Sequence, residues 1–498
     1  MALIQITDLT FTYPGSFDPV FEHVSFQLDT DWRLGLTGRN GRGKTTLLRL
    51  LQGQYPHQGT ITAPGGFEYF PYPIPDAALT PLELLECSFP DVPQWRLRRE
   101  LAPLFVTDDA LYRPFSTLSG GEQAKILLAL LFAREGRYLL IDEPTNHLDE
   151  TGRALVSRYL AKKSGFLLVS HDRAFLDGCV DHILSINRGG IEVQKGNFSS
   201  WYENRQRQDA FELAQNAQLK KEIGRLKQAA RQSRAWADKV ENTKIGPHSA
   251  KVTGEADAMG GRAYIGEQSR RMQQRRKNLE RRQNAAIEEK SALLKNIEQA
   301  APLKLHQLPY HTDRLALLRD VSVCYGGAPV CRGVSFCVEQ GDRIALRGAN
   351  GTGKTSLLRL LCGEDVPHTG TVERSSRLRI SYVRQDPSGL RGDLGAYAAR
   401  YGLDESLFKA ILRKLDFARV QFEKDMADFS AGQKKKVLLA RSLCEPSHLL
   451  VWDEPLNYVD VLSRIQLEEL LLEFQPTIVF VEHDRVFCDR VATKAVTL

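Results

Sequence analysis

Apolar residues gather along the chain in short runs, and each run ends at a turn, a glycine-rich stretch or an acidic residue. Segments with the spacing of an amphipathic helix follow several of them. The runs stand at 32–36, 138–141, 166–169, 343–346, 449–452 and 478–481, with helical spacing at 45–51 and 123–132. Strands that are apolar on both faces and alternate with helices are typical of a mostly parallel sheet. The pattern therefore predicts an α/β fold.

The later runs belong to a repeat of the earlier ones. The stretch Gly38–Thr46 (GRNGRGKTT) returns as Gly348–Ser356 (GANGTGKTS), 310 residues further on, and Asp142-Glu143-Pro144 returns 311 residues further on at Asp453. Self-similarity at a nearly fixed offset indicates a duplicated unit. A chain of 498 residues also has room for about three compact units. We therefore predict a first domain at 1–201, a linker at 202–305 and a second domain at 306–498.

The linker holds the whole excess of positive charge. Residues 201–300 carry 21 Lys and Arg against 13 Asp and Glu, whereas the net charge of the full chain is only +6. Apolar residues recur there at coiled-coil spacing, which predicts two long helices, 202–240 and 267–300. Glycines and Pro247 separate them, so we expect a helical hairpin with a tip loop near 241–266. The charge is either a solvated helical face or a surface that binds a polyanion by releasing counterions.

Composition excludes several other classes of protein. No apolar run approaches the ~20 residues that cross a bilayer, and Asp8 interrupts any signal-peptide core. The eight cysteines are scattered without a C-x-x-C pair, which argues against a zinc site and a disulfide framework. We therefore expect a cytoplasmic protein without a membrane segment.

Each copy contains the phosphate-loop pattern G-x-x-x-x-G-K-[ST]. Its glycines let backbone N–H groups surround phosphate oxygens, its lysine reaches the β- and γ-phosphates, and its threonine hydroxyl suits Mg²⁺. One match can be a coincidence, but two matches after apolar strands favour a phosphate-binding function. The predicted binding residues are Gly38, Asn40, Gly41, Gly43, Lys44, Thr45 and Thr46, and in the second copy Gly348, Asn350, Gly351, Gly353, Lys354, Thr355 and Ser356.

Acidic residues and histidines at the ends of other strands complete a phosphoryl-transfer site. Asp142 and Asp453 end apolar runs and are predicted Mg²⁺ ligands. Glu143 and Glu454 follow directly and are candidates to polarise the attacking water, while His171 and His483 are candidates to contact the γ-phosphate. A lone strand-end Asp-Glu is usually a surface turn and a lone histidine is usually structural. Their repetition in register with the phosphate loops favours the catalytic interpretation.

Residues 118–123 (LSGGEQ) resemble the signature motif of ATP-binding-cassette (ABC) ATPases, and residues 429–433 (FSAGQ) resemble it in the second copy. The resemblance implies ATP and Mg²⁺ as cofactors, and a head-to-tail closure in which each signature covers the phosphate loop of the other copy. It pairs Lys44 with Ser430 and Gly432, and it pairs Lys354 with Ser119 and Gly121; Gly120 is a further predicted ATP-binding residue. Tyr13 and Tyr325 stand where the family stacks an aromatic ring on adenine; a buried structural tyrosine is the alternative.

Two departures from the family pattern distinguish the copies. Gln385 matches the family's glutamine loop and is a predicted Mg²⁺ ligand, but the equivalent position of the first copy is Tyr72, a poor metal ligand. Ala431 replaces a signature glycine. We therefore expect the two sites to differ, with Glu454→Gln more damaging to turnover than Glu143→Gln.

Tandem ABC domains joined by a basic hairpin resemble the ABC-F class of ribosome-associated ATPases, as does the stretch Gly196–Tyr202 (GNFSSWY). The resemblance implies a monomer that pairs its own two ATPase domains and binds the tRNA-exit site of the ribosome, contacting 23S rRNA and P-site tRNA. It implies neither DNA nor a membrane as partner.

Several features are similar to the antibiotic-resistance branch of that class, which protects ribosomes from lincosamides, pleuromutilins and streptogramin A. Ser119 stands only 47 positions after Tyr72, and Ser430 stands 45 positions after Gln385, too few for the arm of housekeeping members, and 15 residues follow His483. The stretch Trp32–Gln52 is also similar. Lys244, Arg262 and Tyr264 of the tip loop are candidates for contact near the drug site. The alternatives are a tip without function, a housekeeping translation factor, and the ATPase subunit of a drug exporter.

Overall fold

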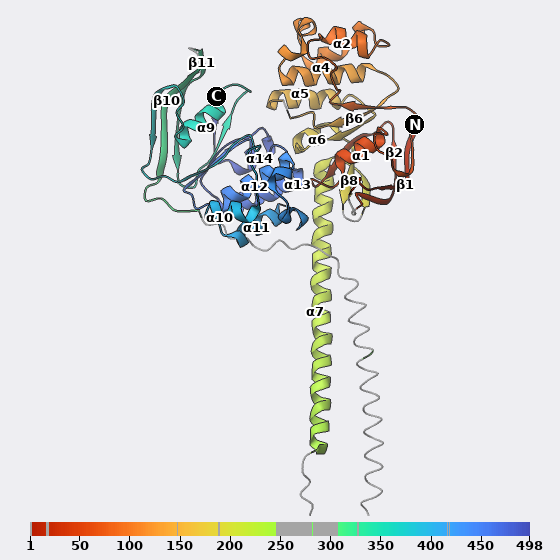
Figure 1. Ribbon diagram of the computed structural model, residues 1–498, viewed down its shortest axis with the longest axis vertical. Helices are drawn as coiled ribbons and strands as arrows, with labels where there is room; N and C mark the ends of the chain where they lie inside the picture. Colours follow the sequence, from red (N-terminus) through yellow and green to blue (C-terminus); the bar gives the residue numbers. More distant parts are fainter. Residues whose placement is uncertain are drawn as a thin grey trace, which may run out of the picture. The chain divides into compact units, whose positions relative to one another are not determined.

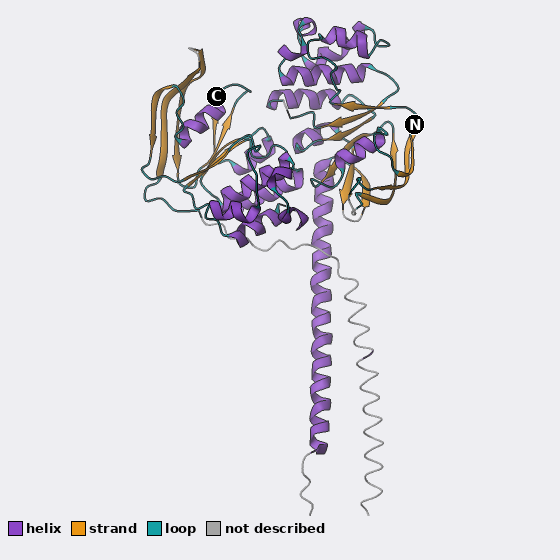
Figure 2. Ribbon diagram, in the orientation of Figure 1, coloured by secondary structure: helices purple, strands orange, loops and turns teal. Residues whose placement is uncertain are grey.

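The computed structural model describes residues 2–15, 19–146, 148–187, 190–245, 281, 307–325, 328–415, 417 and 419–498. The chain forms two compact units, Met1–Trp201 with Ala300–Leu498, and Tyr202–Gln299. The first unit contains both copies of the repeated domain, and each copy is a mixed α/β structure (Figures 1 and 2). The α/β prediction is confirmed.

The first copy is built on a six-stranded sheet in the order β5-β6-β7-β3-β8-β9. All neighbouring strands are parallel except β9, which is antiparallel to β8. A second, antiparallel sheet has the order β2-β1-β4. The strands are β1 (Leu3–Phe11), β2 (Phe21–Asp29), β3 (Arg33–Gly38), β4 (Gln58–Thr62), β5 (Phe67–Phe70), β6 (Tyr138–Asp142), β7 (Phe166–Val169), β8 (His182–Asn187) and β9 (Gly190–Lys195).

The helices of the first copy follow the strands of the parallel sheet or lie between β5 and β6. They are α1 (Lys44–Leu51), α2 (Pro81–Ser88), α3 (Gln94–Leu101), α4 (Gly120–Ala133), α5 (Glu150–Leu160) and α6 (Arg173–Cys179), with 3₁₀ turns at Ala102–Leu104, Asp108–Tyr112 and Phe115–Thr117. Because parallel strands need crossover connections, β3, β6 and β7 each end in a loop that leads into a helix. The carboxyl ends of these three strands therefore meet at one edge of the sheet.

The second copy repeats this architecture. Its five-stranded sheet, in the order β14-β15-β16-β12-β17, is parallel throughout, and its antiparallel sheet has the order β11-β10-β13. The strands are β10 (Arg314–Tyr325), β11 (Ala328–Glu339), β12 (Arg343–Arg347), β13 (His368–Arg374), β14 (Ile380–Val383), β15 (Leu449–Asp453), β16 (Ile478–Val481) and β17 (Lys494–Thr497). The helices are α9 (Lys354–Cys362), α10 (Leu394–Arg400), α11 (Glu405–Lys414), α12 (Ala431–Cys444), α13 (Val461–Phe474) and α14 (Arg485–Val491), with 3₁₀ turns at Arg419–Glu423 and Met426–Asp428.

The parallel strands are buried on both faces, as their continuous apolar sequences predict. All four residues of β7 and all four of β16 are buried, and Leu34 and Leu36 of β3 are fully inaccessible. Burying such a side chain contributes roughly 1.5–3 kcal/mol through the hydrophobic effect. The polar residues at the strand ends are therefore held on a rigid base.

The helix α7 (Phe198–Ile245) begins after β9 and continues into the second unit. It covers the first helix predicted for the hairpin and extends past residue 240 into the predicted tip. Lys244 consequently lies in the last turn of a helix rather than in a loop. Arg262, Tyr264 and the second predicted helix, 267–300, lie outside the described residues apart from the helical position 281.

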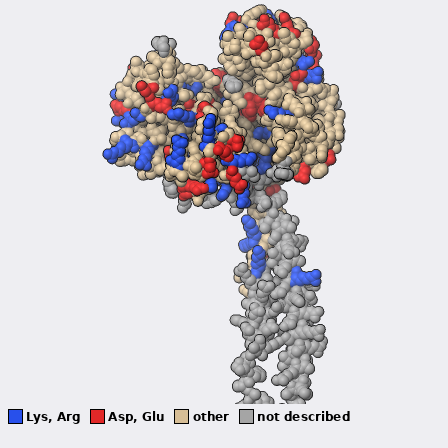
Figure 3. Space-filling model, viewed as in Figure 1, with Lys and Arg blue, Asp and Glu red and all other residues tan. Residues whose placement is uncertain are grey.

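No helix among the described residues is long and apolar enough to cross a bilayer. On the face seen in Figure 3, Lys and Arg side chains intermix with Asp and Glu over both copies of the repeated domain.

Candidate functional site

The two phosphate loops have the same conformation. Gly43 (φ 90°) and Gly353 (φ 83°) are in the left-handed region immediately before α1 and α9, where a side chain would be strained. A Cβ at Gly43 would also lie 2.6 Å from the Val20 side chain. Each loop therefore requires glycine at this point, and each directs a helix N-terminus at the site.

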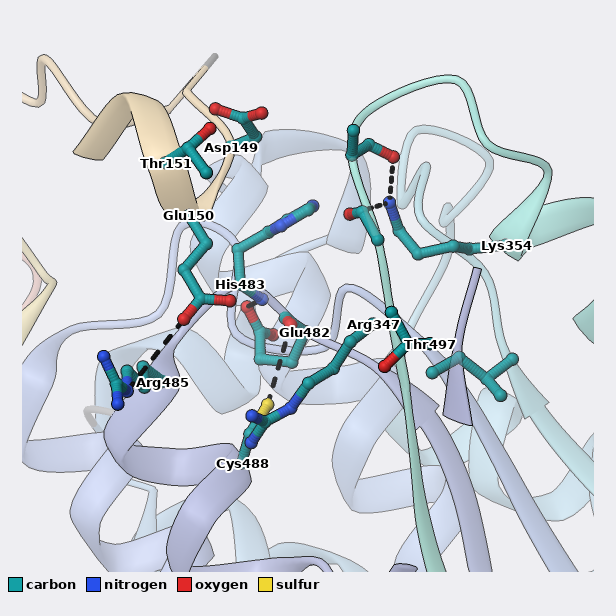
Figure 4. Close-up of a pocket in the computed structure, with 13 residues that line it drawn as sticks. Asp149, Glu150, Thr151, Arg347, Lys354, Glu482, His483, Arg485, Cys488 and Thr497 are labelled. Atoms are coloured by element: carbon teal, nitrogen blue, oxygen red, sulfur yellow. Dashed lines mark hydrogen bonds and ion pairs between the residues drawn. The ribbon is translucent and has the colours of Figure 1, made fainter. Parts of the chain in front are cut away.

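The two phosphate-loop lysines point back into their own loops. The Nζ of Lys44 donates to the carbonyl of Gly38 (2.7 Å) and to Oδ1 of Asn40 (3.2 Å). The Nζ of Lys354 donates to the carbonyls of Gly348 (2.9 Å) and Ala349 (2.7 Å), as Figure 4 shows. Burial lowers the pKa of both ammonium groups. These donors face the interior of the loops, where phosphate oxygens are expected.

The predicted adenine-stacking tyrosines are exposed. Tyr13 is 38% exposed and Tyr325 is 43% exposed, so the alternative of a buried structural tyrosine is wrong. Their hydroxyls are held by the phosphate-loop helices, at 2.7 Å from Thr46 Oγ1 and 3.1 Å from Ser356 Oγ. Each ring therefore has an accessible surface and a fixed anchor beside the loop.

The residues predicted to hold Mg²⁺ fit a hard cation with oxygen ligands. Thr45 Oγ1 donates to Asp142 Oδ2 (3.3 Å), which joins the predicted pair. Asp453 is fully buried, and neither of its carboxylate oxygens accepts a well-formed hydrogen bond. Burial raises the pKa of Asp453 to about 6, partly offset by the Thr355 hydroxyl. A buried carboxylate with so little hydrogen bonding from the described residues is the chemistry that a divalent cation satisfies.

The predicted catalytic glutamates differ in their surroundings, although both adopt a left-handed backbone (φ 50° and 45°). The Nε2 of His171 lies 3.3 Å from Glu143 Oε1, and the Nε2 of His483 lies 3.6 Å from Glu454 Oε1. Gln385 Nε2 donates to Glu454 (2.6 Å), so its Oε1 is the atom left for a cation, and the Asn457 amide also donates to Glu454 (2.6 Å).

The pKa values of the two glutamates consequently move in opposite directions. Burial, followed by the charge of Asp142, raises the pKa of Glu143 to about 8. Burial also disfavours the charged form of Glu454, but hydrogen bonds from His483, Gln385 and Asn457 outweigh it and lower the pKa. Burial, followed by the Lys44 charge, lowers the pKa of His171 well below its usual value.

The signature segments begin two matching helices. Ser119 and Ser430 cap α4 and α12, and in each case the serine side chain accepts from the backbone N–H three residues later. Both serine side chains are therefore engaged within their own helices. Ala431 is exposed, whereas a Cβ at Gly432 would lie 2.5 Å from the Tyr458 carbonyl oxygen. Glycine is thus required at 432 but not at 431.

The two copies contribute to common sites. Gly120 lines a cavity of about 490 Å³ together with Asn350, Lys354, Thr355 and Glu454. A second cavity, of about 350 Å³, places Asp149 and Glu150 opposite Lys354 and His483 (Figure 4).

Residues of the second copy also reach the first phosphate loop. The Asn40 side chain donates to the Tyr458 carbonyl (2.9 Å) and lies 3.1 Å from the Cβ position of Gly432. Each phosphate loop is therefore met by the signature segment of the other copy.

The structure adds residues that sequence reasoning missed. The Tyr69 hydroxyl donates to Asp142 Oδ2 (3.0 Å), whereas Tyr72 packs against Phe89 with ring centroids 4.9 Å apart. A tyrosine does contact the carboxylate predicted to hold Mg²⁺, but it lies on β5 rather than in the loop that follows. The buried Arg173 of α6 donates to the fully buried Glu468 of α13 (2.6 Å), a contact between copies that no motif indicates.

Comparisons with known proteins agree with this architecture. The family model described as "ABC transporter" matches residues 21–68 and 331–457. Ribosome protection protein VmlR of Bacillus subtilis is 27% identical over 98% of this chain and 85% of its own length. ATP-binding protein Uup of Caulobacter vibrioides is 29% identical over 96% of this chain and 75% of its own length.

Two solved structures share the fold. The chain of archaeal ribosome recycling factor aABCE1, crystallised with stalk protein aP1, has a TM-score of 0.62 at 17% identity, covering 98% of this chain and 87% of that chain. RNase-L Inhibitor has a TM-score of 0.58 at 20% identity, covering 93% of this chain and 82% of that chain. With two phosphate loops, two signature segments and similar proteins along nearly its whole length, the chain is an ATP hydrolase of ABC type that resembles the ABC-F class.

Proposed function

We propose that this protein is a ribosome-binding ATPase that protects the ribosome from antibiotics directed at the peptidyl-transferase region. It binds the tRNA-exit site in its ATP-bound, closed form and leaves after hydrolysis. The observation that carries the proposal is the likeness, over 98% of the chain, to a protein named for ribosome protection. The closed pairing of the two copies supplies a means by which ATP controls such binding.

The exposed charge of α7 supports a polyanionic partner. Lys220, Lys221, Arg225 and Lys227 are all exposed within about two turns of this helix. Lys and Arg gain affinity for RNA by releasing the counterions of phosphates, so this cluster suits ribosomal RNA. We further propose 23S rRNA and P-site tRNA as the molecules contacted, with Lys244, Arg262 and Tyr264 near the drug site.

Within each site, the protein's own residues have distinct tasks. Lys44 and Lys354, with the loop N–H groups, bind the phosphates, while Tyr13 and Tyr325 stack on adenine. Thr45 with Asp142, and Thr355 with Asp453 and Gln385, would hold Mg²⁺, which neutralises phosphate charge when bound. Glu143 and Glu454 orient the attacking water and accept its proton, and His171 and His483 hold the γ-phosphate.

Co-sedimentation with ribosomes tests this proposal. The Glu143→Gln/Glu454→Gln protein should keep ATP in both sites and pellet with ribosomes when ATP is present, because hydrolysis no longer opens the pair. The matched control is the same protein with Lys44→Ala and Lys354→Ala added, which should stay in the supernatant. Binding to membrane vesicles instead of ribosomes would identify an exporter subunit and contradict the proposal.

A susceptibility panel in a sensitive host separates protection from a housekeeping role. Expression should raise the inhibitory concentrations of lincosamides, pleuromutilins or streptogramin A by several fold. Replacing residues 245–263 with a short Gly-Ser turn should remove that protection while ribosome binding persists. Ribosome binding without any drug phenotype would favour a translation factor, and full protection by the truncated protein would show that the tip has no function.

A further inference from the structure

A fully buried lysine, the fifth residue of α12, lies in the second copy. Lys435 is 0% exposed, and its Nζ donates to the carbonyls of Arg384 (3.0 Å), Gln385 (3.2 Å) and Asp453 (3.2 Å). An ammonium group has three donors, and burying it is costly unless each finds an acceptor. Here all three do. Lys435 therefore fastens α12 to the glutamine loop and to the end of β15.

The first copy has no lysine at this position that could make these hydrogen bonds. The position that corresponds to Lys435, 311 residues earlier, is Ala124 of α4. The copies also differ at Glu482, which is buried and corresponds to Ser170. Burial lowers the pKa of Lys435 to about 8, and the charge of Glu482 is the largest contribution in the opposite direction. The second copy thus replaces an Ala and a Ser by two buried, opposite charges, which argues for a function rather than for packing alone.

Glu482 belongs to the wall of the second site. It accepts from the backbone N–H groups of Leu456 (3.1 Å) and His483 (2.7 Å), and Figure 4 shows it beside His483. The buried charges of Lys435 and Glu482 therefore support the loops that carry Gln385, Asp453 and His483. These are the loops expected to move when nucleotide enters or leaves the second site.

The N-terminus of α12, about one turn before Lys435, faces the first site. The helix begins after Ser430, and Gly432 packs against Asn40 of the first phosphate loop. One short stretch of helix consequently contacts the first site through Gly432 and the second site through Lys435. An α-helix is stiff over so short a distance, so a displacement at one residue is transmitted to the other.

We propose that Lys435 is a positioning residue that couples nucleotide occupancy of the second site to turnover at the first. When ATP orders the loops of Gln385 and Asp453, the three hydrogen bonds of Lys435 bring the start of α12 against the first phosphate loop. Because Ala124 makes no equivalent bonds, α4 lacks this path in the opposite direction. The inference rests on the composite sites proposed above and does not depend on the ribosome.

The test measures first-site ATP turnover with the second site either loaded or empty. Glu454→Gln leaves the second site loaded but inactive, and Lys354→Ala leaves it empty. The loaded-to-empty ratio should be about 5-fold or more, the lower end of usual couplings between sites. Lys435→Met, which keeps the length of the side chain but has no donors, should reduce the ratio to about 1.

Three controls give the result its meaning. Lys434→Met, one residue earlier on α12, should keep the full ratio. The converse ratio, second-site turnover with the first site loaded (Glu143→Gln) or empty (Lys44→Ala), should not respond to Lys435→Met. Lys435→Gln retains two N–H donors and should give an intermediate ratio.

Several outcomes would overturn the proposal. They are an unchanged ratio in a folded Lys435→Met protein, or a ratio near 1 when Lys435 is present. If Lys435→Met does not fold, as judged by its thermal unfolding, the Lys435→Gln protein replaces it in the test. An unchanged loaded-to-empty ratio in that protein would then overturn the proposal. If Lys44→Ala fails to abolish turnover in the Glu454→Gln protein, the assignment of the sites is wrong, which is a distinguishable failure.

Discussion

The two glutamates that we propose as catalytic, Glu143 and Glu454, should give the two sites different pH profiles. The pKa of Glu143 is raised to about 8 by burial, so about a tenth of it is ionised at pH 7 and about nine tenths at pH 9. The pKa of Glu454 is lowered by its hydrogen bonds, so this group stays ionised over the same range. Because only the ionised carboxylate accepts a proton from water, first-site turnover should rise as the pH rises through the pKa of Glu143.

The magnitude follows from those fractions. In the Glu454→Gln protein, which retains the first site, steady-state turnover should increase about tenfold between pH 7 and pH 9. In the Glu143→Gln protein it should be nearly flat. At pH 7 the Glu454→Gln substitution should therefore cause the greater loss.

The assay is phosphate release at saturating Mg²⁺ and ATP, with nucleotide occupancy followed by fluorescence at each pH. The Glu143→Gln/Glu454→Gln protein supplies the background rate. The reasoning would be refuted if the two pH profiles of turnover superimposed after this background was subtracted. Equal losses of turnover from the two single substitutions at pH 7 would refute it as well.

Three further predictions concern buried polar contacts. Lys436→Met should lower the free energy of unfolding by about 3–5 kcal/mol, because the fully buried Asp460, 2.9 Å away, loses the cation of its ion pair. Adding Asp460→Asn should restore part of the lost thermal midpoint. Tyr69→Phe, made in the Glu454→Gln protein, removes a hydrogen bond that orients Asp142. The Mg²⁺ concentration needed for half-maximal turnover should therefore rise about tenfold. An unchanged Mg²⁺ titration would refute this role of Tyr69. Arg173→Met should lower the thermal midpoint by several degrees, since the buried Glu468 loses one of its two ion pairs and keeps only Arg490; scanning calorimetry would test this.

The sequence was sufficient for the features that are local in the chain. The phosphate loops, the strands before them and the order of the elements could be predicted because glycine spacing and continuous apolar runs act over a few residues. The meeting of Gly120 with Lys354 could be anticipated only from the resemblance, since nothing in either segment specifies its partner.

Contacts between segments that are distant in the chain could not be predicted from sequence patterns. Arg173 and Glu468 lie 295 residues apart, and each looks like an ordinary surface charge in the sequence. Lys435 stands in a run of three lysines, which is normally a solvated stretch, yet the fold buries two of the three. Tyr72 matches Gln385 in strand register, but its ring packs against Phe89, and Tyr69 contacts the metal carboxylate instead. Burial decided each case, and burial is set by the tertiary fold.

The differences between the copies form a consistent set. At four matched positions the first copy has Tyr72, Ala124, Ser157 and Ser170, where the second has Gln385, Lys435, Glu468 and Glu482. Three of the four changes add a charge, and all three charges are buried. A buried charge is retained only where partners compensate its desolvation, so each commits neighbouring loops to one arrangement. The pattern of the phosphate loops, the strand-end aspartates and the glutamates that follow them are the same in both copies, so both sites suit the same ligand. Both sites therefore keep the same chemistry, while Lys435 and Glu482 hold the loops of the second site, as the proposed coupling from the second site to the first requires.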